Sequence, residues 1–167
     1  MLIRKACDSD IKELLDIYNY EVENGVATLD IQPKNIEQWT CWYKAHNINN
    51  HPLIVAQVDD AIAGYASLSP YREKEAYKST VELSVYVHND YRQQGVATML
   101  MDNILKLAAE DERTHMVVSV ITSGNEASCK LHQKFGFEFC GTIKEVGEKF
   151  GRLLDIDNYQ LILKSTK

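Results

Sequence analysis

The sequence predicts an α/β fold in which helices flank a mixed central sheet, folded as a single domain over residues 1–167. Some segments alternate apolar and polar residues with a period of two, which is typical of strands. Segments between them repeat apolar residues every three or four positions, which is typical of helices. With only 8 glycines and 3 prolines, the chain has little material for a flexible linker between domains.

The N-terminal half predicts a strand at 2–6, two helices and then a pair of strands. Asp8 or Ser9 is expected to cap the first helix, because a short side-chain oxygen satisfies free helix amides. The apolar face of this helix has i, i+3, i+4, i+7 spacing and carries Ile11, Leu14, Leu15 and Tyr18. Residues 19–30 are expected to be irregular, and Pro33 to open a second helix with Ile36, Trp39 and Tyr43 on one face. Strands at 53–58 and 62–68 flank an Asp59-Asp60 turn.

The C-terminal half begins, after a charged loop at 70–78, with the clearest strand of the sequence, at 80–87. One face carries Val81, Leu83, Val85 and Val87, and the other carries Thr80, Glu82, Ser84 and Tyr86. A helix at 95–109, a strand at 117–121, a helix at 125–135 and strands at 137–146 and 153–163 follow. The predicted order is strand, two helices, three strands, helix, strand, helix and two strands.

Composition and charge exclude several classes of function. The net charge is −6, which argues against a protein that binds nucleic acid through a basic face. No apolar run approaches the roughly 20 residues of a membrane span, and the N-terminus lacks the apolar core of a signal peptide. Cys7, Cys41, Cys129 and Cys140 lack metal-binding spacing, so we expect no metal site. We expect mostly buried, reduced thiols in a cytoplasmic protein.

The junction between the strand at 80–87 and the next helix carries the main functional signal. Arg92-Gln93-Gln94-Gly95-Val96-Ala97 places free backbone amides at a helix N-terminus, which favours binding of a phosphate group. Gly95 and Ala97 leave the backbone bare, so that a bulky anion can approach. The segment matches neither the P-loop pattern nor the dinucleotide-binding pattern of glycines.

This junction resembles the pyrophosphate loop of the GNAT acetyltransferases, in the form Arg92-x-x-Gly95-x-Ala97 directly after a strand. A later segment, Asn125, Ser128, Leu131-His132 and Phe135-Gly136-Phe137, resembles the second cofactor segment of the family. Tyr77-x-x-Thr80-Val81-Glu82-x-Ser84 and Val146-Gly147-x-Lys149-x-Gly151 are similar to the phosphinothricin and methionine-sulfone N-acetyltransferase branch. Leu29 and Leu154 depart from that branch, in which aromatic residues are common at both places.

The resemblance implies the GNAT fold, with about seven strands, and acetyl-CoA as co-substrate. It implies cofactor contacts by Val85, Tyr86, Val87, Arg92, Gln93, Gln94, Gly95, Val96, Ala97, Thr98, Asn125 and Ser128. Glu82 is implied as the base that deprotonates the amine, against the alternative of a surface carboxylate. His132 is implied as the acid that protonates the thiolate or as a helper of Glu82, against a packing histidine. Asn125 is also a natural helix N-cap.

The resemblance implies a small-molecule amine as substrate, with an amino acid or analogue such as methionine sulfone or phosphinothricin favoured. Arg72 or Lys74 would bind its carboxylate, and Thr28 and Tyr77 would line the pocket, unless the charged loop is simply solvated. Trp39 and Trp42 are interpreted as helix packing. Alternatives are a polyamine, aminoglycoside or protein N-terminal acetyltransferase, or an acyl-CoA-binding domain without turnover. Members of this branch commonly form homodimers, so a dimer is expected.

Overall fold

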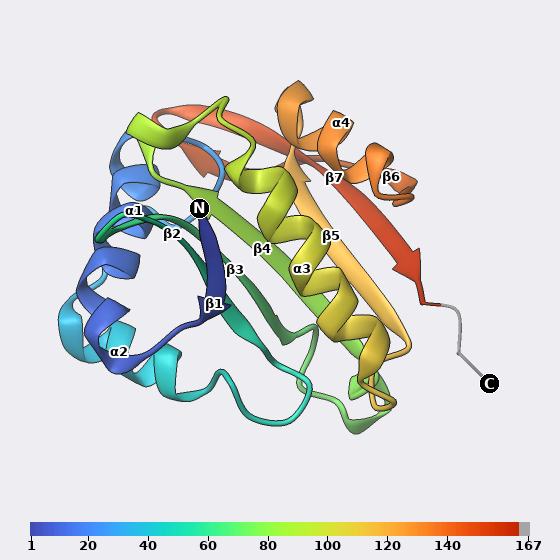
Figure 1. Cartoon of the computed structure of the whole chain (residues 1–167). Coiled ribbons are helices and arrows are strands. Elements are labelled where there is room, and N and C mark those ends of the chain that lie inside the picture. The colour runs from blue at the N-terminus through green and yellow to red at the C-terminus, as the bar shows by residue number, and fades with distance from the viewer. Residues whose placement is uncertain (164–167) are drawn as a thin grey trace.

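The computed structural model describes residues 1–163, in which seven strands form one mixed sheet flanked by helices (Figure 1). The strands are β1 (Leu2–Lys5), β2 (Leu53–Val58), β3 (Ala61–Pro70), β4 (Thr80–Val87), β5 (Met116–Thr122), β6 (Glu138–Lys149) and β7 (Arg152–Ile162). The helices are α1 (Ile11–Asn24), α2 (Ile36–Lys44), α3 (Val96–Glu110) and α4 (Glu126–Lys134). The strand order is β1-β2-β3-β4-β5-β7-β6. The predicted fold class and the order of the main elements are confirmed.

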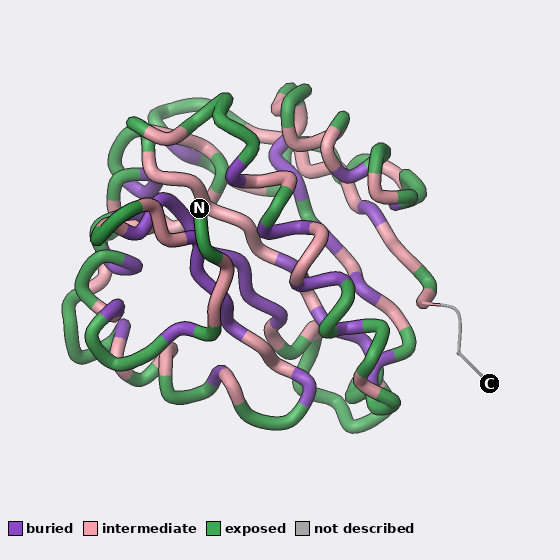
Figure 2. The backbone as a smooth tube through the Cα atoms, in the orientation of Figure 1, coloured by how far each residue is buried: buried purple, intermediate pink, exposed green. Residues whose placement is uncertain are grey.

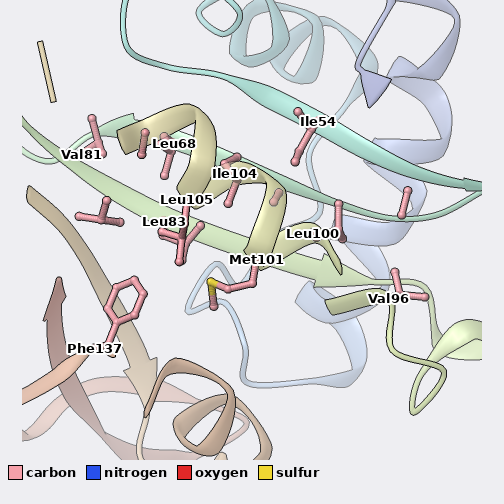
Figure 3. Close-up of a cluster of buried hydrophobic side chains, with 14 of the residues drawn as sticks. Ile54, Leu68, Val81, Leu83, Val96, Leu100, Met101, Ile104, Leu105 and Phe137 are labelled. Atoms are coloured by element: carbon pink, nitrogen blue, oxygen red, sulfur yellow. The ribbon is translucent and has the colours of Figure 1, made fainter. Parts of the chain in front are cut away.

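Both faces of the central strands are buried, because each face is covered by different helices. In β2, Ile54 and Ala56 belong to the cluster of apolar side chains that includes α3, whereas Leu53 and Val55 pack with α1 and α2. Figure 2 shows the resulting buried segments along the middle of the sheet. Figure 3 shows α3 presenting Leu100, Met101 and Ile104 to side chains of neighbouring strands. The sheet is therefore the middle layer of the fold.

The strands β4 and β5 separate after a short parallel ladder. Only Thr80, Val81 and Glu82 of β4 pair with β5, opposite Met116, Val117 and Val118. From residue 83 onward β4 remains paired with β3, while β5 remains paired with β7 up to Thr122. The two strands diverge toward the end of the sheet where α3 begins, and this opening is where a ligand can reach the backbone of β4.

Several predicted boundaries are confirmed and others are wrong. The strands at 53–58 and 80–87 have the predicted bounds. Residues 19–24 continue α1 instead of being irregular. Pro33 does not open α2; the N-cap is Asn35, whose side chain accepts a hydrogen bond from the amide of Gln38 in a capping box. Ile36 stays 50% exposed and does not share the buried face with Trp39.

The prediction of mostly buried cysteines is wrong. All four thiols are free, but Cys7, Cys41 and Cys140 are exposed and Cys129 is half-buried. The burial of a thiol depends on the side chains that surround it in the fold, so the spacing of the cysteines in the sequence gave no information on it. Among residues 1–163, no helix is long and apolar enough to cross a membrane.

Candidate active site

A cavity of about 750 Å³ opens where β4 and β5 separate. Its wall is built by the second half of β4, the 91–98 junction, the end of β5 and the start of α4. The predicted cofactor residues that line it are Val85, Tyr86, Val87, Arg92, Gln93, Gly95, Val96, Ala97, Thr98, Asn125 and Ser128. Gln94 is the exception, because its side chain turns away and donates to the carbonyl oxygen of Asp90. Both predicted catalytic residues, Glu82 and His132, line the same cavity.

The 92–98 junction has the backbone of an anion site. Gln93 and Gly95 adopt left-handed conformations, with φ of 61° and 81°. Within residues 1–163, the amides of Gln93, Gln94 and Gly95 donate to no protein acceptor. The first amides of α3 are free by helix geometry. A Cβ atom added to Gly95 would meet no atom within 4 Å, so the space in front of the loop is open. The loop therefore fits a pyrophosphate group.

The side chain of Arg92 contacts α1 as well as lining the cavity. Its guanidinium forms an ion pair with the carboxylate of Glu21 on α1 and lies 5.7 Å from the ring centroid of Tyr20. Glu21 is 9% exposed and also lines the cavity. Sequence reasoning missed Glu21, since it is 71 residues from its partner. The ion pair fixes Arg92 at the cavity wall and joins α1 to the phosphate loop.

Asn125 combines its two predicted roles. Its side-chain oxygen accepts a hydrogen bond from the amide of Ser128 at 3.2 Å, so it caps α4. It also lines the cavity, which leaves its amide nitrogen available to a ligand. The cap is therefore compatible with a cofactor contact.

Glu82 lies at the point where β4 and β5 part. It is half-buried, and burial raises the pKa of its carboxyl group. Within residues 1–163, this carboxylate forms no ion pair and accepts no hydrogen bond, so nothing in the described chain occupies its lone pairs. A carboxylate with a raised pKa beside an open cavity suits the abstraction of a proton from an ammonium group.

His132 is 4% exposed and its protonation state follows from its neighbours. Its Nδ1 lies 2.8 Å from the carbonyl oxygen of Ser128, which can only accept, so Nδ1 carries the proton. Burial lowers the pKa of the imidazole, which is therefore neutral with its lone pair on Nε2. Within the described residues Nε2 has no hydrogen-bond partner. In this state His132 can accept a proton, which favours its predicted role as a helper of the base Glu82.

The loop after α1 brings Thr28 into the cavity. This loop is held by Lys149, which is part of a family motif but had no role assigned from the sequence. Lys149, 2% exposed, donates from Nζ to the carbonyl oxygens of Thr28 at 2.9 Å and Glu21 at 3.3 Å. Burial lowers the pKa of its amine. Leu29 also lines the cavity and packs directly on Gly147, so the hairpin of β6 and β7 shapes the wall beside Thr28.

The other predicted substrate residues lie elsewhere. Arg72, Lys74 and Tyr77 belong to the loop between β3 and β4 and line neither this cavity nor a second one described below. The guanidinium of Arg72 lies over the rings of Tyr71 and Tyr77, at 5.0 and 5.9 Å from their centroids. Lys74 is exposed. Residues 1–163 contain no group of three metal-ligating side chains.

Comparison with known proteins agrees with this geometry. A profile of the Acetyltransferase (GNAT) family matches residues 13–137. The L-methionine sulfoximine/L-methionine sulfone acetyltransferase of Pseudomonas paraeruginosa is 37% identical over 166 residues, which cover 99% of this chain and 96% of that protein. The structure of a phosphinothricin acetyltransferase from Sinorhizobium meliloti in complex with acetyl-CoA is 30% identical, with a TM-score of 0.92 over 99% of this chain and 91% of that chain. The structure of a ribosomal-protein-alanine N-acetyltransferase from Brucella melitensis is 39% identical, with a TM-score of 0.94 over 98% of this chain and 100% of that chain.

The chain belongs to the GNAT acetyltransferase family. Within that family it is similar to the methionine-sulfone and phosphinothricin acetyltransferases, as its motifs predict. It is an N-acetyltransferase whose co-substrate is acetyl-CoA, and these two predictions are confirmed.

Proposed function

We propose that this enzyme acetylates the α-amine of a small amino acid or amino-acid analogue, with Glu82 as base. The observation that carries the proposal is the unpaired, half-buried Glu82 carboxylate in the same cavity as the free amides of the phosphate loop. The substrates named for the relatives share one chemistry. Methionine sulfone, methionine sulfoximine and phosphinothricin are amino acids whose side chains end in a methyl-bearing sulfur or phosphorus with two polar atoms.

The chemistry follows from the residues around the cavity. Acetyl-CoA supplies an activated thioester carbonyl. The amides of 93–98 hold its pyrophosphate, and the free edge of β4 at Val85 and Val87 pairs with the amide-bearing arm as a strand pairs with a guest strand. Glu82 takes a proton from the substrate ammonium, so that the amine nitrogen can attack the carbonyl carbon. The new C–N bond replaces the C–S bond, and the departing thiolate takes a proton that the amine has lost. Neutral His132 assists by accepting a proton through Nε2.

We further propose that the chain acts as a single domain, in the cytoplasm, and as a homodimer. The support for a dimer is the apolar surface of β6 and β7. Phe139, Ile143 and Val146 on the 12-residue edge strand β6, and Leu153 on the neighbouring strand β7, are each between 49% and 58% exposed. Apolar area of this kind on a sheet edge favours burial against a second copy.

A protein N-terminus is the second candidate acceptor, because the ribosomal-protein-alanine N-acetyltransferase has so similar a fold. A peptide and a free amino acid both present an α-amine, but only the free amino acid has a carboxylate beside it. The decisive assay measures thiol release from acetyl-CoA with free amino acids, methionine sulfone, phosphinothricin, polyamines and peptides with N-terminal alanine.

The proposal expects turnover of amino acids and poor turnover of their amides and of polyamines. If Arg72 or Lys74 binds the carboxylate, its replacement by alanine raises KM for amino acids and leaves KM for amides unchanged. Faster turnover of the alanine peptides than of every amino acid would contradict the proposed substrate class.

A further inference from the structure

A second cavity, of about 360 Å³, lies on the face of the sheet covered by α1 and α2. Of the four buried side-chain polar atoms without a hydrogen-bond partner among residues 1–163, three belong to residues that line this one cavity. They are Trp39 Nε1, Tyr65 Oη and Ser67 Oγ, whose residues are 3%, 0% and 1% exposed. A buried polar group without a partner costs about 1–3 kcal/mol, so three such atoms beside one cavity favour the binding there of water or of a ligand with polar atoms.

The chemistry of these atoms defines what the ligand must offer. The indole Nε1 of Trp39 can only donate, so it requires an acceptor, and the two hydroxyl groups can donate as well. Ser69 provides a contrast in the same cavity, because its hydroxyl already donates to Nε2 of His46, whose Nδ1 donates to the carbonyl oxygen of Trp42. The available groups therefore fit a ligand with hydrogen-bond acceptor atoms.

The rest of the wall is aromatic and carries one ion pair. The rings of Tyr18 and Trp42 both stack on the ring of Trp39, with centroid distances of 4.7 and 4.3 Å. Asp30 accepts from the hydroxyl of Tyr18 at 2.5 Å and pairs with Lys34 at 3.0 Å. Burial opposes the ionisation of Asp30, but these hydrogen bonds lower the pKa of its carboxyl group. Because the two charges compensate each other, the cavity favours a compact polar group with apolar substituents and no net charge.

The second cavity adjoins the first one. Ser84 and Tyr86 line both, and they pair across the sheet with Ser67 and Tyr65. Glu82 precedes Ser84 by two residues on the same strand face, about 7 Å away. In methionine sulfone four covalent bonds, or roughly 5–6 Å when extended, separate the amine nitrogen from the sulfur. An amine at Glu82 therefore brings the sulfur to the mouth of the second cavity.

We infer that this second cavity is the specificity pocket for the substrate side chain, and that Trp39, Tyr65 and Ser67 recognise acceptor oxygens on it. The inference rests on the proposed function and makes it more specific. The pocket selects amino acids whose side chain ends in a small neutral group with hydrogen-bond acceptor oxygens, such as a sulfone. Trp39, expected to serve in helix packing, is thereby a binding residue.

The test compares L-methionine sulfone with L-methionine, which has the same carbon skeleton and lacks the two oxygens. Steady-state thiol release is measured for the wild type, Ser67→Ala and Tyr65→Phe. Thr114→Val is the matched control, since it removes a buried hydroxyl outside both cavities. The wild type should prefer the sulfone in kcat/KM by about tenfold or more. Each pocket variant should reduce this preference by about fivefold, through KM for the sulfone, and the control should not.

The KM for acetyl-CoA should stay unchanged in every variant. Equal kcat/KM for sulfone and methionine in the wild type overturns the inference and leaves the proposed function standing. The same conclusion follows if the pocket variants change only thermal stability, because the hydroxyl groups then bind internal water. A wild type that acetylates no amino acid overturns the proposed function and the inference together.

Discussion

Replacing Gly95 with aspartate should weaken acetyl-CoA binding by about tenfold to a hundredfold. Gly95 has a φ of 81°, so any side chain there costs about 1–2 kcal/mol of backbone strain, which Gly95→Ala shares. The Cβ meets no atom within 4 Å, so both variants fit sterically. What aspartate adds is a negative charge in front of the amides that would hold the pyrophosphate. At about 5 Å and an effective dielectric constant of about 40–80, each like-charge pair costs about 1–2 kcal/mol.

The assay is calorimetric titration of acetyl-CoA into wild type, Gly95→Ala and Gly95→Asp at two salt concentrations. The affinity gap between the two variants should narrow at high salt, because the repulsion is screened. Gly151→Asp is the control, with a φ of 68°, the same open space at its Cβ and a position outside the cavity wall. A Gly95→Asp protein that is folded and binds within twofold of Gly95→Ala would refute the assignment of this loop.

Three further predictions concern residues whose charge state the structure fixes. Glu82→Gln should lower kcat at least about a hundredfold with acetyl-CoA affinity retained. The wild-type rate should decrease as the pH is lowered through the raised pKa of Glu82, and the pH–rate profile of the variant should lack this decrease. Lys149→Met should cost about 1–3 kcal/mol in chemical denaturation and raise KM for the amine, because it leaves the carbonyl of Thr28 without its donor; unchanged stability would contradict this role. Burial lowers the pKa of His46, so the unfolded chain takes up a proton first as pH falls below about 6.5. The contribution of neutral His46 to the free energy of unfolding should therefore be complete at pH 8 and smaller at pH 5.5. If the free energy of unfolding of His46→Gln depends on pH as that of the wild type does, this role of His46 is excluded.

The strand that supports the site was predictable because its pattern is local. The residues of 80–87 alternate strictly between an apolar face and a second, mostly polar face. The loop after the strand combines Gly95 with the start of a helix, so pattern and motif point to the same element. The C-terminal turn of α1 was not predictable, since residues 19–24 are mostly polar. Glu21 is buried there only because Arg92, far along the chain, neutralises it. That pairing is tertiary and leaves no periodic signal.

The second cavity was missed for a related reason. Trp39 and Trp42 on a short helix have the spacing of ordinary packing residues, and they do stack on each other. What distinguishes Trp39 is that its indole nitrogen lacks a partner, together with the hydroxyl groups of Tyr65 and Ser67. Whether a buried polar atom finds a hydrogen-bond partner depends here on three segments that meet in space, and a sequence pattern does not encode it. The contact of the Arg72 guanidinium with the ring of Tyr71 is likewise a feature that the sequence pattern does not encode.

The divergence of β4 and β5 after three paired residues couples the stability of the folded chain to the binding of acetyl-CoA. A strand edge and a loop with unsatisfied amides form an incomplete structure, which acetyl-CoA completes by binding the folded chain and not the unfolded one. By mass action, ligand at a hundred times its Kd adds about 2.7 kcal/mol to the free energy of unfolding. Complete removal of acetyl-CoA from that concentration therefore increases the unfolded fraction about a hundredfold and exposes more of the enzyme to proteases.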